Sequence, residues 1–325
     1  MTDKSNLKKA REILEKVLAV SPAICKLQLC LASTRKDNIP DFQRVVITDS
    51  VVCEFQDIIL KFLKKYTKEM KANNLILHKY EASTKLDSHE VEFLNLAEFS
   101  EVKKQIGSLA NIPGLAKFES DEDFIENLRF YVLILKCEKL KPIYFFRTYT
   151  PKRELSRSSF MAIIFDKNQY EKVTDSLLLF DKKIDCIYSD GYLFIKNKAN
   201  FQRIFEFYSL LIKSAKQTLR AIKENIPIDN FTAFSKACEG HLLKLAKLKN
   251  IASKPYFEKL KMSDIKTAIK KYNLDIKTVG SGKGEKIHFD SSDKWGILKL
   301  LDDDYLDSIM TGSSYEVNSK RLRST

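Results

Sequence analysis

The chain has 325 residues, 44% of them hydrophobic, and its 56 Lys and Arg against 43 Asp and Glu give a formal net charge of +13. This length and hydrophobic content exclude an intrinsically disordered protein and allow roughly two domains with buried cores. The charge favours a polyanionic partner, either nucleic acid or an anionic membrane surface, although a lysine-rich proteome would also produce a basic chain.

The first part of the chain, residues 1–118, is predicted to be an N-terminal α/β domain. Apolar residues at helical spacing predict helices over 5–19 and 54–70. Runs rich in β-forming residues predict strands at 24–33, 44–49 and 75–83. A short helix and the turn Ile112-Pro113-Gly114 are predicted within residues 91–118, and we place the domain boundary after them.

The middle of the chain, residues 119–228, is predicted to be an antiparallel-sheet domain. Turn signals such as Ser189-Asp190-Gly191 separate short strand-like runs at 128–140, 141–150, 160–166, 177–181, 184–190 and 192–197. Asn200 is predicted to cap a long amphipathic helix that Pro227 ends and that packs on this sheet. These elements predict the α+β fold class.

The last part, residues 229–325, is predicted to be a basic helical region with a β-hairpin. Helical runs cover 229–251, 255–261 and 263–272. The segments 275–279 and 285–289 are predicted to be strands joined by GSGKG, and a final helical stretch carries apolar residues from Trp295 to Ile309. The order of helices and hairpin is compatible with a winged helix.

Lysine is concentrated in residues 236–286, which hold thirteen lysines and five acidic residues, so this segment contributes +8 of the net charge. Lysine is a point charge suited to phosphate, and the absence of arginine between Arg220 and Arg321 argues against bidentate reading of bases. We therefore predict DNA binding with little sequence preference and a steep salt dependence. The predicted DNA contacts in this region are Lys244, Lys247, Lys249, Lys254, Lys259, Lys261, Lys266, Lys270, Lys271 and Lys283.

A second basic patch surrounds the run FFRTYTPKRELSRS and adds Arg147, Lys152 and Arg153 to the predicted DNA contacts. This patch either extends the same surface or faces a partner. Aromatic residues lie among the lysines, and they either stack on bases or, as is more common at this density, belong to the core.

Catalytic and cofactor motifs are weak in this sequence. GSGKG is interpreted as a hairpin loop and not as a P-loop, because Lys277 stands where the first glycine is required and a strand follows the loop. The histidines are dispersed and show no zinc-ligand spacing. We predict no cofactor, no metal site and no catalytic residue.

Carboxylates allow one enzymatic alternative. Asp166 and Asp181 both follow strand-like runs, so a Mg²⁺-dependent nuclease is retained as the runner-up. The run Asp302-Asp303-Asp304 cannot direct three carboxylates at one ion from a helix, and we predict that it forms a helix N-terminal turn or contacts basic residues.

The cysteines and apolar runs indicate a soluble, cytoplasmic protein. The six cysteines are scattered in apolar runs without a C-x-x-C pair, which is typical of free thiols in a reducing compartment. The N-terminus lacks the apolar stretch of a signal peptide, and no apolar run approaches the roughly 18 residues that span a bilayer.

Several strings together resemble the B-protein family of the Kiwa anti-phage defence system over about residues 128–325. They are IYFFRTYTPKREL, IFDKNQYEKV, LLLFDKKIDCIYSDGYLFIKNKANFQRIFEFY and LLDDDYLDSIMTGSSYEVNSKR. The resemblance implies that a transmembrane A protein recruits this DNA-binding protein to the inner face of the membrane, where the two block replication or expression of phage DNA. A homodimer or higher oligomer is also expected. Besides the nuclease, a membrane-docked scaffold whose lysines meet anionic lipid remains an alternative.

Overall fold

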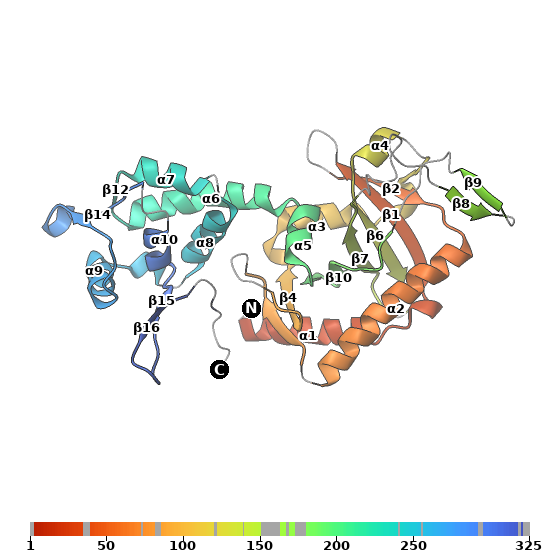
Figure 1. The fold of residues 1–325 in the computed structure, drawn as a ribbon, viewed down its shortest axis with the longest axis horizontal. Helices are drawn as coiled ribbons and strands as arrows, with labels where there is room; N and C mark the ends of the chain where they lie inside the picture. The colour runs from red at the N-terminus through yellow and green to blue at the C-terminus, as the bar shows by residue number, and fades with distance from the viewer. Residues whose placement is uncertain are drawn as a thin grey trace. The chain divides into compact units, whose positions relative to one another are not determined.

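The computed structural model describes residues 3–34, 40–72, 74–81, 86–119, 122–138, 140–150, 163–166, 169–172, 180–239, 241–254, 256–291, 295–317 and 320 (Figure 1). Contacts divide the chain into two compact units. We call residues 1–80 with 86–205 the sheet unit, and residues 81–85 with 206–325 the C-terminal unit.

The sheet unit contains the elements from the N-terminus to residue 205. Its helices are α1 (Asp3–Leu18), α2 (Asp49–Lys71), α3 (Ser100–Gly107), α4 (Glu122–Glu126) and α5 (Lys198–Ile204). Its strands are β1 (Lys26–Thr34), β2 (Pro40–Val45), β3 (Ile76–Lys79), β4 (Glu90–Asn95), β5 (Ala116–Lys117), β6 (Leu128–Lys136), β7 (Ile143–Thr148), β8 (Ile163–Asp166), β9 (Gln169–Lys172), β10 (Cys186–Ser189) and β11 (Tyr192–Ile195). Short 3₁₀ turns lie at Pro22–Ile24, Leu96–Glu98 and Ile112–Gly114.

Among the described residues, nine strands form one sheet in the order β3-β4-β11-β10-β7-β6-β1-β2-β5. Its neighbours are antiparallel except at the two edges, where β3 is parallel to β4 and β5 is parallel to β2. The predicted antiparallel pairing of the central strands β6, β7, β10 and β11 is therefore confirmed, and so is the α+β class. The division into three domains stays a prediction, although this sheet joins strands from both sides of residue 118.

Both faces of the central strands are buried. Helices α1 and α2 pack their apolar stripes on one face, where Leu29, Leu133 and Phe145 belong to the same core. On the opposite face, Phe146 of β7 contacts Phe205 at the end of α5, with ring centroids 5.2 Å apart. Successive residues along most of β1 and β6 are buried, as expected for strands that are covered on both faces.

The helix predicted to start at Asn200 is two helices. Asn197 is the N-cap of α5 and accepts a hydrogen bond from the backbone N–H of Asn200 at 3.1 Å. The chain then turns at Glu206, whose φ of 48° is left-handed, and α6 (Phe207–Asn225) begins in the C-terminal unit. Both helices bury one face, so the apolar pattern continues across the break. The prediction of a single helix is therefore wrong.

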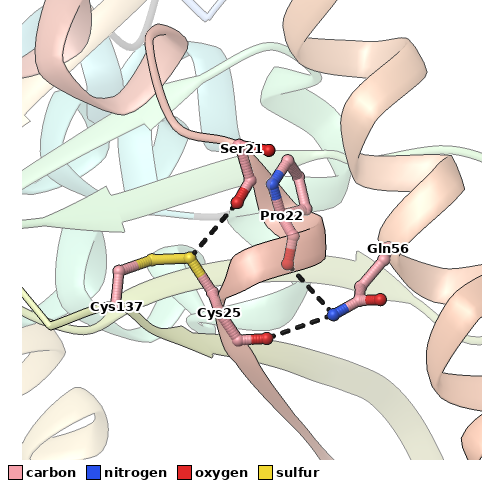
Figure 2. The surroundings of a disulfide bond; sticks show 5 residues. All are labelled: Ser21, Pro22, Cys25, Gln56 and Cys137. Atoms are coloured by element: carbon pink, nitrogen blue, oxygen red, sulfur yellow. Dashed lines mark hydrogen bonds between the residues drawn. A yellow bond between two sulfur atoms is a disulfide. The ribbon is translucent and has the colours of Figure 1, made fainter.

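Cys25 and Cys137 form a disulfide bond, which corrects the expectation that all the cysteines are free thiols (Figure 2). The β1–β6 ladder pairs Lys26 with Lys136, so the two cysteines lie opposite each other at the end of the ladder, with Cα atoms 4.6 Å apart. Gln56 of α2 anchors this corner by donating to the carbonyl of Cys25 at 3.1 Å. The 112 residues between the cysteines hide this proximity in the sequence.

Other cysteines of the described chain are free thiols, as expected: Cys30, Cys53, Cys186 and Cys238. Burial raises the pKa of Cys30 to about 12 and that of Cys238 to about 11. These two thiols therefore stay protonated and serve as small apolar groups of the core.

The C-terminal unit is mostly helical with short strands. Its helices are α6, α7 (Phe231–Glu239), α8 (Leu242–Ser253), α9 (Met262–Lys271) and α10 (Gly296–Leu301). Its strands are β12 (Ile228–Asp229), β13 (Thr278–Val279), β14 (Lys286–His288), β15 (Tyr305–Asp307) and β16 (Ser314–Glu316), and 3₁₀ turns lie at Phe257–Lys259 and Gly282–Gly284. Strand β14 is antiparallel to β13 and parallel to β12, while β15 and β16 form a separate hairpin.

The predicted hairpin around GSGKG is confirmed, but the final helical stretch is shorter than predicted. Helix α10 ends at Leu301, and Asp303 has a left-handed φ of 60° that stops it. The residues from Tyr305 onward form the β15–β16 hairpin. In the sheet unit, β2 ends at Val45, so the predicted strand at 44–49 is wrong beyond that residue.

The sequence predicts that no apolar run is long enough to span a bilayer. Within the part of the chain that the structure describes, no helix is both long enough and apolar enough to cross a bilayer.

Candidate nucleic-acid interface

Helix α9 carries the most accessible part of the predicted interface. The helix begins where the Asp264 carboxylate accepts the backbone N–H of Lys261 at 3.1 Å, and it buries Ile265 against the unit. Lys270 and Lys271 occupy its last turn, where positive charge complements the helix dipole. Asn273 then takes a left-handed φ of 49° and ends the helical path.

We define the α9 lysines as the exposed lysines on this helix and immediately before it: Lys259, Lys261, Lys266, Lys270 and Lys271. Lys266 and Lys270 are four residues apart and therefore stand one turn from each other on the same face. Among the residues that the structure describes, no ion pair holds Lys259, Lys261 or Lys270. Their ammonium groups are available to an anionic ligand.

The other two α9 lysines join the helix to neighbouring elements. Lys266 pairs with Glu285 at 3.0 Å, at the start of β14, and Lys271 pairs with Asp307 of β15 at 2.6 Å. The hydrogen bond from Lys266 lowers the pKa of Glu285, and that from Lys271 lowers the pKa of Asp307. Both lysine side chains are 54% exposed, so these pairs add little stability and can exchange partners.

The GSGKG loop lies between β13 and β14 and is not a P-loop, since a strand follows it. Gly280 has a φ of +84°, and a Cβ there would come within 2.7 Å of the Gly284 carbonyl oxygen. Only glycine satisfies both the left-handed conformation and this close approach. The backbone of Lys283 is in this loop, but its side chain lies outside the described residues.

Helix α8 presents a different group of lysines, which are buried. Lys244 and Lys247 are each 7% exposed. The Lys244 ammonium donates to the carbonyl of Ala237 at 2.9 Å and lies 5.5 Å from the ring centroid of Trp295. Lys249 is half-buried, with its ammonium 5.6 Å from the ring of Phe207. The ammonium groups of Lys244 and Lys249 therefore already contact other groups of the C-terminal unit.

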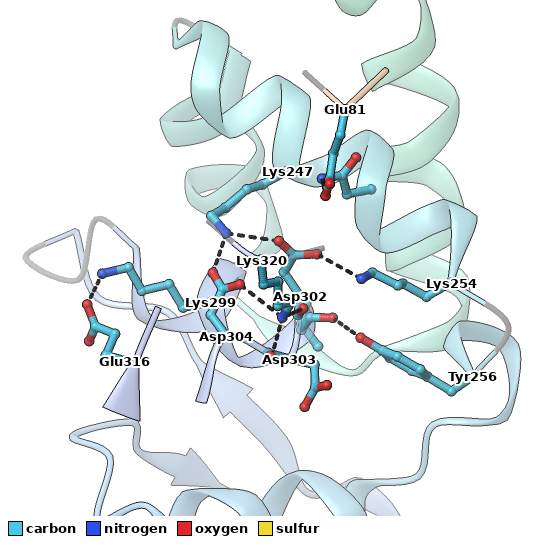
Figure 3. A network of polar contacts seen from close by, with 12 residues as sticks. Glu81, Lys247, Lys254, Tyr256, Lys299, Asp302, Asp303, Asp304, Glu316 and Lys320 are labelled. Carbon is cyan, nitrogen blue, oxygen red and sulfur yellow. Dashed lines mark hydrogen bonds and ion pairs between the residues drawn. The ribbon is translucent and has the colours of Figure 1, made fainter. Parts of the chain in front are cut away.

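Lys247 is the centre of an ion-pair network (Figure 3). Its ammonium bonds Asp302 at 2.9 Å and also bonds Asp304. Lys254 approaches the other oxygen of Asp302 at 3.8 Å, and Lys320 pairs with Asp304 at 3.0 Å. Burial alone would lower the pKa of Lys247, but its hydrogen bonds to the two carboxylates outweigh burial and raise that pKa.

This network resolves the role of the Asp302-Asp303-Asp304 run. The predicted contact with basic residues is confirmed. The predicted helix N-terminal turn is wrong, because Asp302 follows the C-terminal end of α10. The carboxylates join the segment after α10 to α8, 55 residues earlier in the chain.

In the second basic patch, which belongs to the sheet unit, the described residue Arg147 is also paired with carboxylates. Arg147 is 13% exposed and forms a two-pronged pair with Asp181, with Nε–Oδ1 at 2.7 Å, and a further bond to Asp185 at 2.7 Å. Asp185 is buried and also accepts from Thr148, through its backbone N–H at 2.8 Å, and from Asn200 at 2.8 Å. Lys152 and Arg153 lie outside the described residues.

The nuclease alternative depends on Asp166 and Asp181. Arg147 occupies the Asp181 carboxylate, and the side chain of Asp166 is outside the described residues. In the described segments, no group of three or more His, Cys, Asp or Glu side chains could hold a metal ion.

A feature that sequence reasoning missed lies beside α9. A cavity of about 600 Å³ is lined by tyrosines, and Tyr272 stacks with Tyr305 at a centroid distance of 5.7 Å and an interplanar angle of 28°. The lining also contains the carboxylates Asp275, Asp290 and Glu316. Lys277 and His288 line the same cavity, and Glu316 is paired with Lys299 of α10.

Fold and surface together define an α+β protein with an exposed lysine group on its C-terminal unit. The family model described as Kiwa protein KwaB-like matches residues 125–311, more than half of the chain, and the chain belongs to this family. Family membership gives the protein a role in Kiwa anti-phage defence. No curated protein and no solved structure matches the chain. The matched range contains α9 and most of the Lys247 network.

Proposed function

We propose that this protein is the DNA-binding effector of a Kiwa defence system and that the α9 lysines contact the phosphates of duplex DNA. The observation that carries this proposal is the exposure of Lys259, Lys261 and Lys270 without an ion pair among the described residues. Accessible ammonium groups displace counterions from the phosphate backbone, and this displacement is the main source of affinity in nonspecific binding.

The proposed interface is smaller than the set predicted from charge alone. Lys244, Lys247 and Arg147 are excluded because their charged groups bond to protein atoms in buried positions. Breaking such bonds to reach a phosphate would leave buried groups unpaired, at a cost that one phosphate contact does not offset. Lys266 and Lys271 remain in the interface because their exposed pairs can open.

The proposed mode of action is occupancy of DNA without sequence choice and without cleavage, at the inner face of the membrane with a transmembrane partner. The lysine-only composition of the C-terminal unit supports the first part, since the segment between Arg220 and Arg321 contains no guanidinium for guanine recognition. Membership of the Kiwa family supports the partnership.

The central experiment compares two triple variants by fluorescence anisotropy with a duplex of mixed sequence. One variant is Lys259→Gln, Lys261→Gln, Lys270→Gln. The matched control removes the same charge from exposed lysines of α1, as Lys8→Gln, Lys9→Gln, Lys16→Gln. We expect the first variant to lose affinity about 500-fold at 0.1 M salt and the log–log salt slope to flatten by about 3.

The control variant should bind DNA like the wild type. Equal losses in the two variants would mean that only net charge matters, and an unaffected α9 variant would overturn the proposed interface.

Cleavage is tested separately with supercoiled plasmid and Mg²⁺. We expect retarded but intact plasmid after incubation with the protein. Nicked or linear plasmid would overturn the non-enzymatic mode of action.

Recruitment is tested by flotation with vesicles of anionic lipid, with and without the transmembrane partner. We expect the protein to float only when the partner is present. Flotation of the protein alone would favour a lipid-docked scaffold.

A further inference from the structure

The β15–β16 hairpin presents two apolar side chains to solvent at its tip. Ile309 is 101% exposed and Met310 is 93% exposed, the largest exposures among the large hydrophobic residues of the described chain. The hairpin extends from the rest of the C-terminal unit in Figure 1. Exposing two such residues side by side opposes the hydrophobic effect, so a binding role is the natural explanation.

The tip is held in one conformation. The carbonyl of Ser308 accepts the N–H of Gly312 at 2.9 Å, and the N–H of Ser308 donates to the carbonyl of Ser313 at 2.9 Å. The side-chain oxygens of Ser308 and Thr311 each accept a further backbone N–H, at 3.2 and 3.3 Å. Gly312 has a φ of +66°, which closes the turn. These bonds fix Ile309 and Met310 in their outward positions before any ligand arrives.

The hairpin carries no net charge that would repel DNA. No Asp, Glu, Lys or Arg lies between Asp307 and Glu316. Asp307 is paired with Lys271 at 2.6 Å, and Glu316 is paired with Lys299 of α10. The two acidic residues at the base of the hairpin are therefore neutralised by lysines.

The base of the hairpin adjoins the end of α9. The Lys271–Asp307 pair and the stacked rings of Tyr272 and Tyr305 join the end of α9 to β15. Ile309 follows Asp307 by two residues, which spans at most about 7 Å of extended chain. The apolar tip is thus attached, through a short hairpin, to the end of the helix that carries the α9 lysines.

We propose that Ile309 and Met310 form a wedge that enters the minor groove of the duplex bound by the α9 lysines and partly unstacks a base step. Ile and Met are among the side chains that kink DNA in this way, and one or two such residues suffice. This inference rests on the proposed DNA binding.

The size of the tip favours DNA over other occupants. Two side chains are far fewer than the roughly 20–30 residues a side of a stable protein interface. Two inserted side chains also bury too little apolar area to anchor a protein stably in lipid on their own. A wedge needs no large area, because the neighbouring lysines supply the affinity.

The experiment uses the full-length protein and a duplex with 2-aminopurine in its central steps, whose fluorescence rises on unstacking, with donor and acceptor dyes at the ends to report bending. Wild-type protein should raise the 2-aminopurine signal and kink the duplex by about 20–90°. The variant Ile309→Ser, Met310→Ser should lose both signals while its salt slope stays that of the wild type. The matched control is Leu243→Ser, Val279→Ser, which removes two other exposed apolar side chains of the same unit.

The outcomes separate this inference from the proposed function. Absence of DNA binding by the wild-type protein would overturn both. Binding with equal unstacking by the wild type and the tip variant would overturn the wedge alone. Normal unstacking by the tip variant together with loss of vesicle flotation, or of a dimer in light scattering, would also overturn it and would assign the tip to lipid or to a second copy.

Discussion

Helices α8 and α9 lie in the same unit, both are rich in lysine, and their lysines have opposite environments. Lys247 of α8 is 7% exposed and is enclosed by carboxylates, whereas Lys266 and Lys271 of α9 keep 54% of their side chains in solvent. The number of charged residues in a region therefore sets its electrostatic potential, but it does not set how many of those charges can bind a ligand. The positions of the compensating carboxylates decide availability.

The physical difference is one of solvation. A buried ammonium has lost its hydration, so its pairing with Asp302 and Asp304 is obligatory. An exposed ammonium keeps water as an alternative partner, so its pair with Glu285 or Asp307 is optional. Arg147 of the sheet unit resembles Lys247 of α8, because the carboxylates of Asp181 and Asp185 bind its guanidinium.

The strongest test of this comparison is the same substitution on both helices. Lys247→Met should lower the free energy of unfolding by about 3–5 kcal/mol, because it leaves two buried carboxylates undercompensated. Lys270→Met should change it by less than about 0.5 kcal/mol. Urea denaturation monitored by circular dichroism measures both, and similar losses for the two variants would refute the distinction between buried and exposed lysines.

The Arg147 network should show a smaller effect of the same kind. Asp185→Ala removes a buried acceptor of bonds from Arg147, Thr148 and Asn200, and we expect a loss of about 2–3 kcal/mol in the same denaturation experiment. The control is Asp181→Ala, which removes the 46% exposed partner of the same guanidinium and should cost about 1 kcal/mol or less. A larger loss for Asp181→Ala than for Asp185→Ala would contradict the role of burial.

The hairpin beside α9 can be tested at two glycines of one loop. Gly280→Ala should cost about 1–3 kcal/mol, since alanine resists the φ of +84° and its Cβ would meet the Gly284 carbonyl. Gly284→Ala has free space around the new Cβ and should change stability by less than about 0.5 kcal/mol. Hydrogen exchange of the β13–β14 amides provides a local readout, and equal protection in the two variants would show that the loop geometry is not required.

The smallest expected effect belongs to a single exposed lysine. Lys270→Met should weaken DNA binding about eightfold at 0.1 M salt and flatten the salt slope by about 0.9, the contribution of one phosphate contact. Anisotropy titrations at several salt concentrations measure both quantities, with Lys16→Met on α1 as the control. An unchanged slope for Lys270→Met would remove this residue from the interface.

Local patterns in the sequence determined the elements that depend on neighbouring residues. The apolar stripe of residues 5–19 predicts α1, that of 54–70 predicts the greater part of α2, and that of 263–272 predicts α9. Helical periodicity is a local property, because residues three and four apart share a face whatever the rest of the chain does. The antiparallel central strands and the GSGKG hairpin were likewise predictable, since turn residues separate them.

The sequence also identified the lysine-rich helix that carries the candidate interface, but not which of its lysines are accessible. Charge density is visible along the chain, and the i, i+4 spacing of Lys266 and Lys270 follows from it. The burial of Lys247 depends on Asp302, 55 residues away, and no local pattern encodes that contact.

Tertiary structure alone decided the remaining features. It paired Cys25 with Cys137, broke the predicted long helix at Glu206, and turned the segment from Tyr305 into a hairpin instead of a helix. Each of these outcomes depends on which distant segments pack together, and apolar or charged residues carry no record of their partner in their own neighbourhood. The sequence therefore determined the inventory of helices, strands and charges, whereas packing determined which cysteines join, which lysines are neutralised, and that Ile309 and Met310 remain exposed.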